Sequence, residues 1–153
     1  MFGKLFTKEK ASDDLPKRYS FQDKLILTWS HDSEGWTAPI PDLVEGAKVY
    51  IGPEAECNNP NDTSCETIIK ILNNIEDQVK LARHYITAEL NRSDKYKDNN
   101  VSADNFRPTG VEIFEHEKTP EEYSLTFDPD FDPGAVYRVR FRQEVPISWG
   151  FDD

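Results

Sequence analysis

The sequence is poor in the residues that most often build metal, redox and catalytic sites. It has 2 cysteines, 3 histidines and 1 methionine among 153 residues. No second cysteine pair or nearby histidine completes a zinc ligand set around the two cysteines. The Walker loop, G-x-S-x-G and G-x-G-x-x-G motifs are also absent. From the sequence we therefore predict no catalytic residue, no metal ligand and no cofactor.

Basic residues and long apolar runs are also scarce. The 18 lysines and arginines against 29 acids give a formal net charge of −11. This charge repels phosphate backbones and anionic lipids, which argues against nucleic-acid and membrane binding, and it attracts a basic protein partner. The alternative is that the negative charge only keeps a cytosolic protein soluble. No run approaches the ~20 apolar residues of a membrane span, and "MFGKLFTKEK" has no signal-peptide core, so we expect a cytoplasmic protein.

The length fits one domain with its own core. Residues 1–18 are polar and are expected to form an N-terminal tether, and residues 19–153 are expected to form a single α+β domain. The clearest element is an amphipathic helix from about Ser64 to Asn91, with "TSCE" at Thr63–Glu66 as a capping box. Its apolar stripe consists of Ile68, Leu72, Ile75, Val79, Ala82, Ile86 and Leu90.

Short strands are expected on both sides of this helix. Before it, "DKLILTWS" and "GWTAPIP" form a hairpin whose turn places Gly35 at positive φ, and "AKVYIGP" follows. After it come "VEIFEHE", "EYSLTF" and "VYRVRFRQEV", the last two with strict alternation. In the last stretch, Tyr137, Val139 and Phe141 are expected to face inward. The sequence thus predicts an antiparallel sheet of about six strands, with one long amphipathic helix packed on one face.

The stretch "FDPDFDPGAVY" has acids at Asp128, Asp130 and Asp132, as at the start of a calcium loop. The sixth position is Pro133 instead of glycine, and the twelfth is Val139 inside an expected strand. We therefore interpret the stretch as a hairpin turn in which Gly134 takes an unusual φ. Whether the Asp128–Asp132 hairpin also binds a cation stays open.

Three arginines, Arg138, Arg140 and Arg142, share one face of the last expected strand. They would either grip an anionic ligand or pair across the sheet with acids, and pairing is the more common arrangement. The candidate acids are Glu112, Glu115, Glu117 and the hairpin aspartates.

Cys57 and Cys65 lie close enough in sequence to bond, although a reducing cytosol favours free thiols. The sequence does not decide between these states, nor does it give the oligomeric state.

The aromatic residues provide the candidate contacts with a partner. "PISWGFDD" ends the chain with Trp149 and Phe151 beside two acids. This tail either packs over the open end of the core or presents an aromatic anchor with acids around it. The predicted contact residues are Trp36, Asp130, Asp132, Trp149 and Phe151.

The second half of the chain, from "VSADNFRPTG" to "VYRVRF", resembles small acidic bacterial proteins that carry a long helix followed by a strand and an acidic hairpin. Some of these relatives are immunity proteins, which neutralise antibacterial toxins. The resemblance is one of layout and transfers no functional residue. It implies a cytoplasmic protein that blocks a basic toxin by direct occlusion. The alternatives are a metal-dependent hydrolase using His31 and His116 with nearby acids, or a non-catalytic housekeeping domain.

Overall fold

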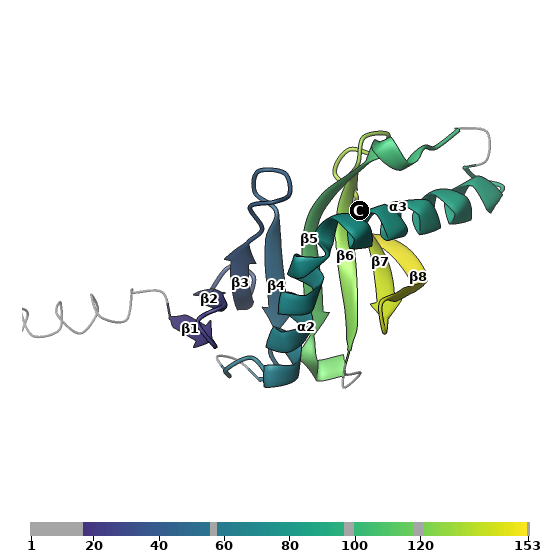
Figure 1. Ribbon diagram of the computed structural model, residues 1–153. Coiled ribbons are helices and arrows are strands. Elements are labelled where there is room, and N and C mark those ends of the chain that lie inside the picture. Colours follow the sequence, from purple (N-terminus) through teal and green to yellow (C-terminus); the bar gives the residue numbers. More distant parts are fainter. Residues whose placement is uncertain (1–16, 56–57, 97–99, 118–120, 153) are drawn as a thin grey trace, which may run out of the picture.

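The computed structural model describes residues 17–55, 58–96, 100–117 and 121–152 (Figure 1). Most of the expected tether lies outside these residues, but Arg18 already begins the first strand. The strands are β1 (Arg18–Phe21), β2 (Leu25–Ser30), β3 (Gly35–Pro39), β4 (Lys48–Gly52), β5 (Phe106–Phe114), β6 (Glu122–Pro129), β7 (Val136–Arg142) and β8 (Val145–Asp152). The helices are α2 (Asp62–Asn73) and α3 (Ile75–Arg92), with short 3₁₀ turns η2 (Ala103–Asn105) and η3 (Glu115–Glu117).

The described strands form one eight-stranded sheet whose spatial order, β1 to β8, is the order along the chain. The β4–β5 pair is parallel, with Val49 opposite Val111, and the other neighbouring pairs are antiparallel. A parallel pair needs a crossover connection, and α2 and α3 provide it. The α+β class and the mostly antiparallel sheet are confirmed. The sheet has more strands than the expected six.

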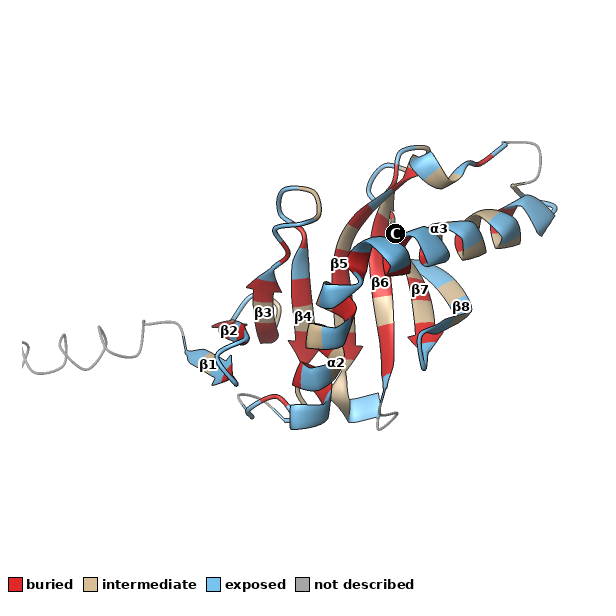
Figure 2. Cartoon of the chain, in the orientation of Figure 1, coloured by how far each residue is buried: buried red, intermediate tan, exposed pale blue. Residues whose placement is uncertain are grey.

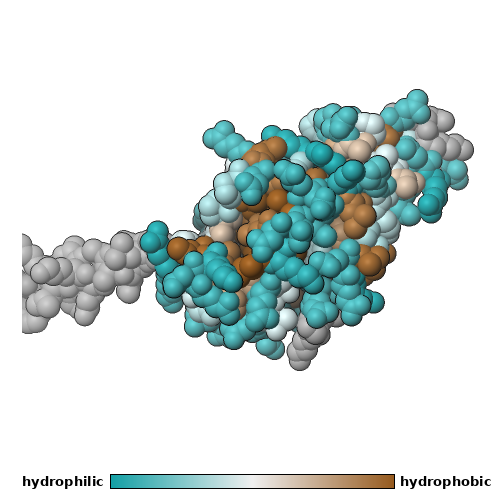
Figure 3. Space-filling model, viewed as in Figure 1, coloured by the Kyte–Doolittle hydropathy of each residue, from teal (hydrophilic) through white to brown (hydrophobic). Residues whose placement is uncertain are grey.

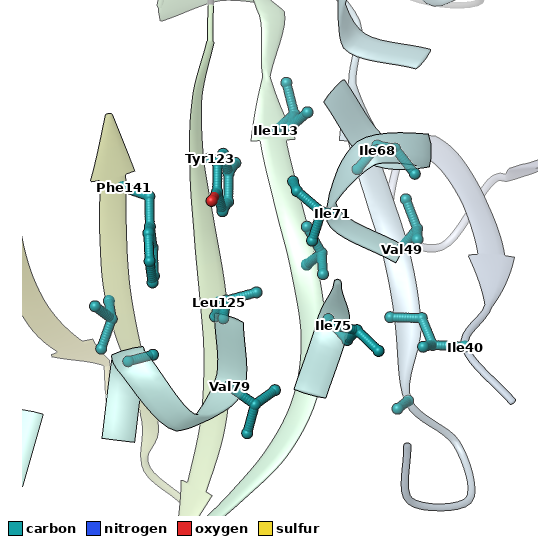
Figure 4. Close-up of a cluster of buried hydrophobic side chains, with 14 of the residues drawn as sticks. Ile40, Val49, Ile68, Ile71, Ile75, Val79, Ile113, Tyr123, Leu125 and Phe141 are labelled. Carbon is teal, nitrogen blue, oxygen red and sulfur yellow. The ribbon is translucent and has the colours of Figure 1, made fainter. Parts of the chain in front are cut away.

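Both helices lie on the same face of the sheet, across its middle and its β5–β8 half (Figure 1). Their buried side chains point down onto the strands, as Figure 4 shows for Ile68, Ile71, Ile75 and Val79 above Val49, Ile113 and Leu125. Buried residues alternate with exposed or half-buried ones along β2 and β7, as expected for strands with one core-facing side (Figure 2). None of the described helices is both long and apolar enough to cross a membrane.

The expected single helix is in fact two helices, separated at Asn74. There φ is −128° and ψ is 27°, outside the helical region, and the Asn74 N–H bonds to the Ile71 carbonyl at 3.0 Å. The break leaves the apolar stripe in phase, because Ile75 is buried like Ile71. Asparagine is a weak helix former that competes for backbone hydrogen bonds, which accounts for the position of the break.

The start of α2 also differs from the expectation. Its N-cap is Asn61, and Thr63–Glu66 lies inside the helix, so the predicted capping box does not form there. The smaller turn before β5 does have a capping box, in which Ser102 and Asn105 exchange hydrogen bonds.

Two strands, β1 and β8, extend the sheet beyond the sequence prediction. Each joins its neighbour through a tight turn with two consecutive residues at positive φ: Gln22 and Asp23 before β2, and Gln143 and Glu144 before β8. In the β2–β3 turn it is Glu34, not Gly35, that has positive φ. Gly35 is instead the first residue of β3. A glycine is needed there because a Cβ would lie 2.3 Å from the Tyr50 ring.

Candidate partner-binding surface

The C-terminal segment forms β8, an edge strand of the sheet. It pairs antiparallel with β7 from Arg142↔Val145 to Val136↔Asp152, with an irregularity between Arg140 and Phe141. The tail therefore extends the sheet as a strand, which the sequence did not predict, and its Trp149 packs against the core. Val145, Ile147 and Phe151 are exposed large hydrophobic residues of this strand. In Figure 3, hydrophobic side chains interrupt the hydrophilic surface where β8 lies in Figure 1.

Aromatic rings gather around Tyr137, the central residue of what we call the aromatic cluster. The Tyr137 ring centre lies 6.0 Å from that of Trp149, 5.4 Å from that of Phe151 and 5.9 Å from that of Phe131. Tyr137 is fully buried, Trp149 is half-buried and Phe151 is 41% exposed. The Lys95 ammonium lies 5.9 Å from the centre of the Phe151 ring. The cluster therefore runs from the core to the surface at the β8 edge.

The hairpin acids lie at the other end of the same cluster. Asp132 accepts a hydrogen bond from the Tyr137 hydroxyl at 3.2 Å. Burial, together with neighbouring Tyr96 and Asp132, raises the pKa of Tyr137 well above its usual value. Asp130 is exposed and accepts from the Asn105 amide at 3.0 Å. The fold thus brings the predicted contacts Asp132, Trp149 and Phe151 together at Tyr137, while Asp130 lies in the same hairpin and bonds to Asn105.

The fifth predicted contact, Trp36, lies elsewhere. It is 2% exposed, its Nε1 donates to the Asn58 carbonyl at 2.7 Å, and it packs edge-on against Trp29. Trp36 belongs to the core between β2 and β4 and is not part of the candidate surface.

The hairpin turn itself agrees with the sequence interpretation. Gly134 has a φ of +89°, and the Ala135 N–H bonds to the Asp132 carbonyl at 3.2 Å. The three aspartates have separate partners, since Asp128 pairs with Arg107 at 2.7 Å. Within the described ranges, no group of three or more histidines, cysteines, aspartates and glutamates is placed to hold a metal ion. His31 lies in the β2–β3 turn and His116 in η3, and neither belongs to such a group among these residues.

The face of the sheet opposite the helices carries the three arginines, which pair with acids. Of the expected acids, Glu112 and Glu117 are partners, whereas Glu122 and Asp152 were not among those predicted. Arg138 Nε lies 2.8 Å from Glu112, and this hydrogen bond raises the pKa of Arg138. Arg138 also pairs with Asp152. The remaining pairs are Arg140–Glu117 at 2.5 Å, Arg140–Glu122 at 3.5 Å and Arg142–Glu122 at 2.5 Å. The polar face of the sheet is therefore an ion-pair network beside β8.

A hollow of about 270 Å³ lies on this polar face. Ser148 and Gly150 of β8 border it on one side, and Glu112, Arg138 and Arg140 of the network border it on the others. Small residues on β8 thus leave the polar side of the edge strand uncrowded.

Cys65 is a buried free thiol at the start of α2. Burial, and then the charges of Glu115, Asp62 and Glu66, raise its pKa to about 12. A protonated, buried thiol is a poor nucleophile. Cys57, the other half of the disulfide considered above, lies outside the described residues.

Sequence reasoning did not assign Tyr137 and Gly150 to this surface. Tyr137 was expected to face inward, which is correct, but its neighbours come from β8, which was not expected as a strand. The alternation Trp149, Gly150, Phe151, Asp152 is the signal that would have indicated a strand.

Comparisons with known proteins give no relative from which to transfer a function: no protein family, no curated protein and no solved structure matches this chain.

Proposed function

We propose that this chain is a small acidic binding protein of immunity type, which blocks a basic protein toxin by covering its active site. The observation that carries the proposal is the convergence of Asp132, Trp149 and Phe151 around Tyr137, at one edge of the sheet.

The aromatic cluster has the form of a binding anchor. Phe151 is exposed, while Trp149 and Tyr137 behind it are held by ring contacts, so little side-chain entropy remains to be lost when a partner covers them. Aromatic residues are enriched among those that contribute most to protein–protein binding.

Charge supplies the choice of partner. The formal charge of −11 steers a basic protein toward the chain and disfavours acidic ones. Asp130 is exposed in the same hairpin as Asp132, two residues away, where it would meet a lysine or arginine of the partner.

The experiment is affinity capture with the tagged full-length chain, followed by calorimetry and an inhibition assay on the purified captured protein. We expect one basic partner at stoichiometric yield, whose toxic activity is lost in the complex. Affinity should fall as salt is raised, because part of it is electrostatic.

Matched variants make this test specific. Phe151→Ala and Asp130→Lys should each weaken binding by about tenfold or more, the range of an anchor residue or a reversed contact charge. Asp32→Lys changes the charge equally but lies in the β2–β3 turn, and it should leave affinity nearly unchanged. Equal affinity of all three variants, or a partner that remains active when bound, would rule out occlusion by this surface.

A further inference from the structure

We infer that β8 is a strand-addition site: an extended segment of the basic partner pairs with its outer edge and lengthens the sheet. This inference rests on the proposed function and specifies how the partner is held. In such a mode the main-chain hydrogen bonds supply affinity, and alternate side chains supply specificity.

The two edges of the sheet differ in the features that normally prevent pairing. An edge strand presents unpaired N–H and C=O groups, and proteins usually protect it by shortening it or by adding charge. β1 has 4 residues, its first residue is Arg18, and Lys17 directly precedes it. β8 has 8 residues and no charged side chain from Val145 to Phe151. Pro146 and the irregularity opposite Arg140 and Phe141 interrupt its first residues, so Ile147–Phe151 is the stretch without such protection. Among the described strands, β8 has no neighbour on its outer side.

Gly150 is a second feature of β8 that indicates strand addition. Glycine inside a strand weakens it, and often marks a place where another backbone approaches closely. Gly35 and Gly110 are explained by the fold itself, because a Cβ would lie 2.3 Å from Tyr50 and 2.6 Å from the Lys48 carbonyl oxygen. A Cβ on Gly150 would meet none of the described residues within 4 Å, and its φ is not positive. The packing of the described residues gives no reason for a glycine there.

The charge of the chain decides the occupant between a second copy and a foreign segment. Pairing two copies through β8 would bring together two molecules that each carry a formal charge of −11. Such a net charge keeps a protein monomeric and attracts a basic partner. The occupant is therefore an extended segment of a basic protein.

The two faces of the edge define the side chains that this segment needs. On the helix side, Trp149 and Phe151 present aromatic surface to apolar residues of the added strand. On the polar side, Ser148 and Gly150 border the hollow, which has room for a long side chain. Glu117 is 39% exposed, pairs with Arg140 and lines the same hollow. Three glutamates against two arginines line this hollow, so its net charge would attract a lysine: Glu112, Glu117 and Glu122 against Arg138 and Arg140. The segment thus alternates apolar and basic residues.

The test uses the full chain and a capped synthetic peptide of alternating valine and lysine, equal in length to β8. Backbone amide exchange is followed by NMR with and without the peptide. We expect the outward-facing amides of Ile147–Phe151 to exchange more slowly when the peptide is added, while those of β1 do not change. The same peptide with a central proline should give no protection, because proline cannot complete the hydrogen-bond ladder.

Substitutions at the two edges provide the matched pair. Gly150→Lys should weaken peptide binding by about tenfold or more, because it places a like charge beside the lysines of the added strand. The space around Gly150 means that this variant should still fold, as thermal melting will verify. Ser20→Lys adds the same charge to the exposed edge of β1 and should not affect binding.

The outcomes separate this inference from the proposed function. Absence of protection, equal protection by the proline peptide, or protection at β8 that grows with protein concentration as dimers form would each overturn strand addition. If the captured basic partner binds Gly150→Lys as well as the original chain, strand addition is wrong and the proposed function stands. If β8 shows peptide protection that Gly150→Lys abolishes, and no basic partner is captured, the edge site stands and the proposed function fails.

Discussion

Glu115 caps helix α2 from the opposite side of the crossover: its Oε1 accepts a hydrogen bond from the Asn61 N–H at 2.6 Å. In a local capping box, the third residue of the helix reaches back to the N–H of the N-cap. Here that third residue is Ser64, and a glutamate that follows β5 takes the role instead. The contact joins the first turn of α2 to the strand that the crossover leads to.

We expect Glu115→Ala to lower the free energy of unfolding by about 1 kcal/mol, the usual cost of losing a helix cap. Chemical denaturation followed by circular dichroism measures this change. Glu66→Ala removes the same charge from an exposed position in the first turns of α2 and should cost less. Equal losses in the two variants would mean that the effect is one of charge near the helix start, not of the hydrogen bond.

A buried hydrogen bond joins the sheet to α3, since the Tyr123 hydroxyl donates to Gln78 Oε1. Both residues are buried. Removing one partner leaves a buried polar group unsatisfied, so Tyr123→Phe should cost about 1–3 kcal/mol of stability. Gln78→Leu in the same chain should then cost less than it does alone. A double-mutant cycle by urea denaturation gives the coupling, and strictly additive losses would contradict a direct bond.

Stability should fall on the alkaline side of neutrality. Burial raises the pKa of Cys65 from 9.0 to about 12, and burial also raises the pKa of Tyr123. Between about pH 9 and 12 the unfolded thiol ionises while the folded thiol stays protonated, so unfolding releases a proton and rising pH favours it. The contribution is fully present below pH 9. Urea melts across this range, in a Cys57→Ser background, should show a shallower decline for Cys65→Ala.

Gly110 lies where β5 meets the parallel neighbour β4. A Cβ at this position would be 2.6 Å from the Lys48 carbonyl oxygen, a backbone atom that cannot move without widening the strand pair. We expect Gly110→Ala to cost about 1–3 kcal/mol, as overpacking usually does. Gly150→Ala is the matched control and should be nearly neutral in thermal melts, because the added Cβ contacts none of the residues that the structure describes. A neutral Gly110→Ala would show that the β4–β5 pair is looser than described.

The β7–β8 turn carries two non-glycine residues at positive φ, Gln143 at 49° and Glu144 at 64°. Left-handed backbone is unfavourable for such residues, and Asn-Gly is the preferred pair for turns of this kind. Replacing Gln143–Glu144 by Asn-Gly should therefore raise stability by about 1 kcal/mol. The exposed Lys70–Glu144 ion pair that is lost contributes little. A fall in the melting temperature would contradict this reading of the turn.

The sequence predicted the elements whose side-chain period is long and uninterrupted. The stripe from Ile68 to Leu90 gave the helical layer, and Tyr137, Val139 and Phe141 gave the inward side of β7. The arginine pairing also followed from alternation, because acids and arginines share the polar face. These features depend on burial along one element, which a single sequence records well.

The features that were missed depend on contacts between elements or on costly local conformations. Asn74 breaks the helix without shifting its apolar stripe. Gln143 and Glu144 form a tight turn without the glycine that normally signals one, so β8 was not predicted as a strand. The convergence of Asp132 and Phe151 on Tyr137 needs β8 in place. The candidate surface was therefore predicted as separate residues but not as one site.

The order of the strands has a consequence for how the protein folds. Every pair except β4–β5 joins strands that follow each other closely in the chain. The sheet therefore consists of two local meanders, β1–β4 and β5–β8, joined by one long-range pairing between β4 and β5, which we call the seam. Local pairings close quickly, whereas the seam must wait until the whole α2–α3 crossover is spanned. The meander β5–β8 carries the candidate surface, and its pairings need no contact from β1–β4. The seam then sets the cooperativity of the molecule, because the two halves of the core become one only when β4 and β5 meet.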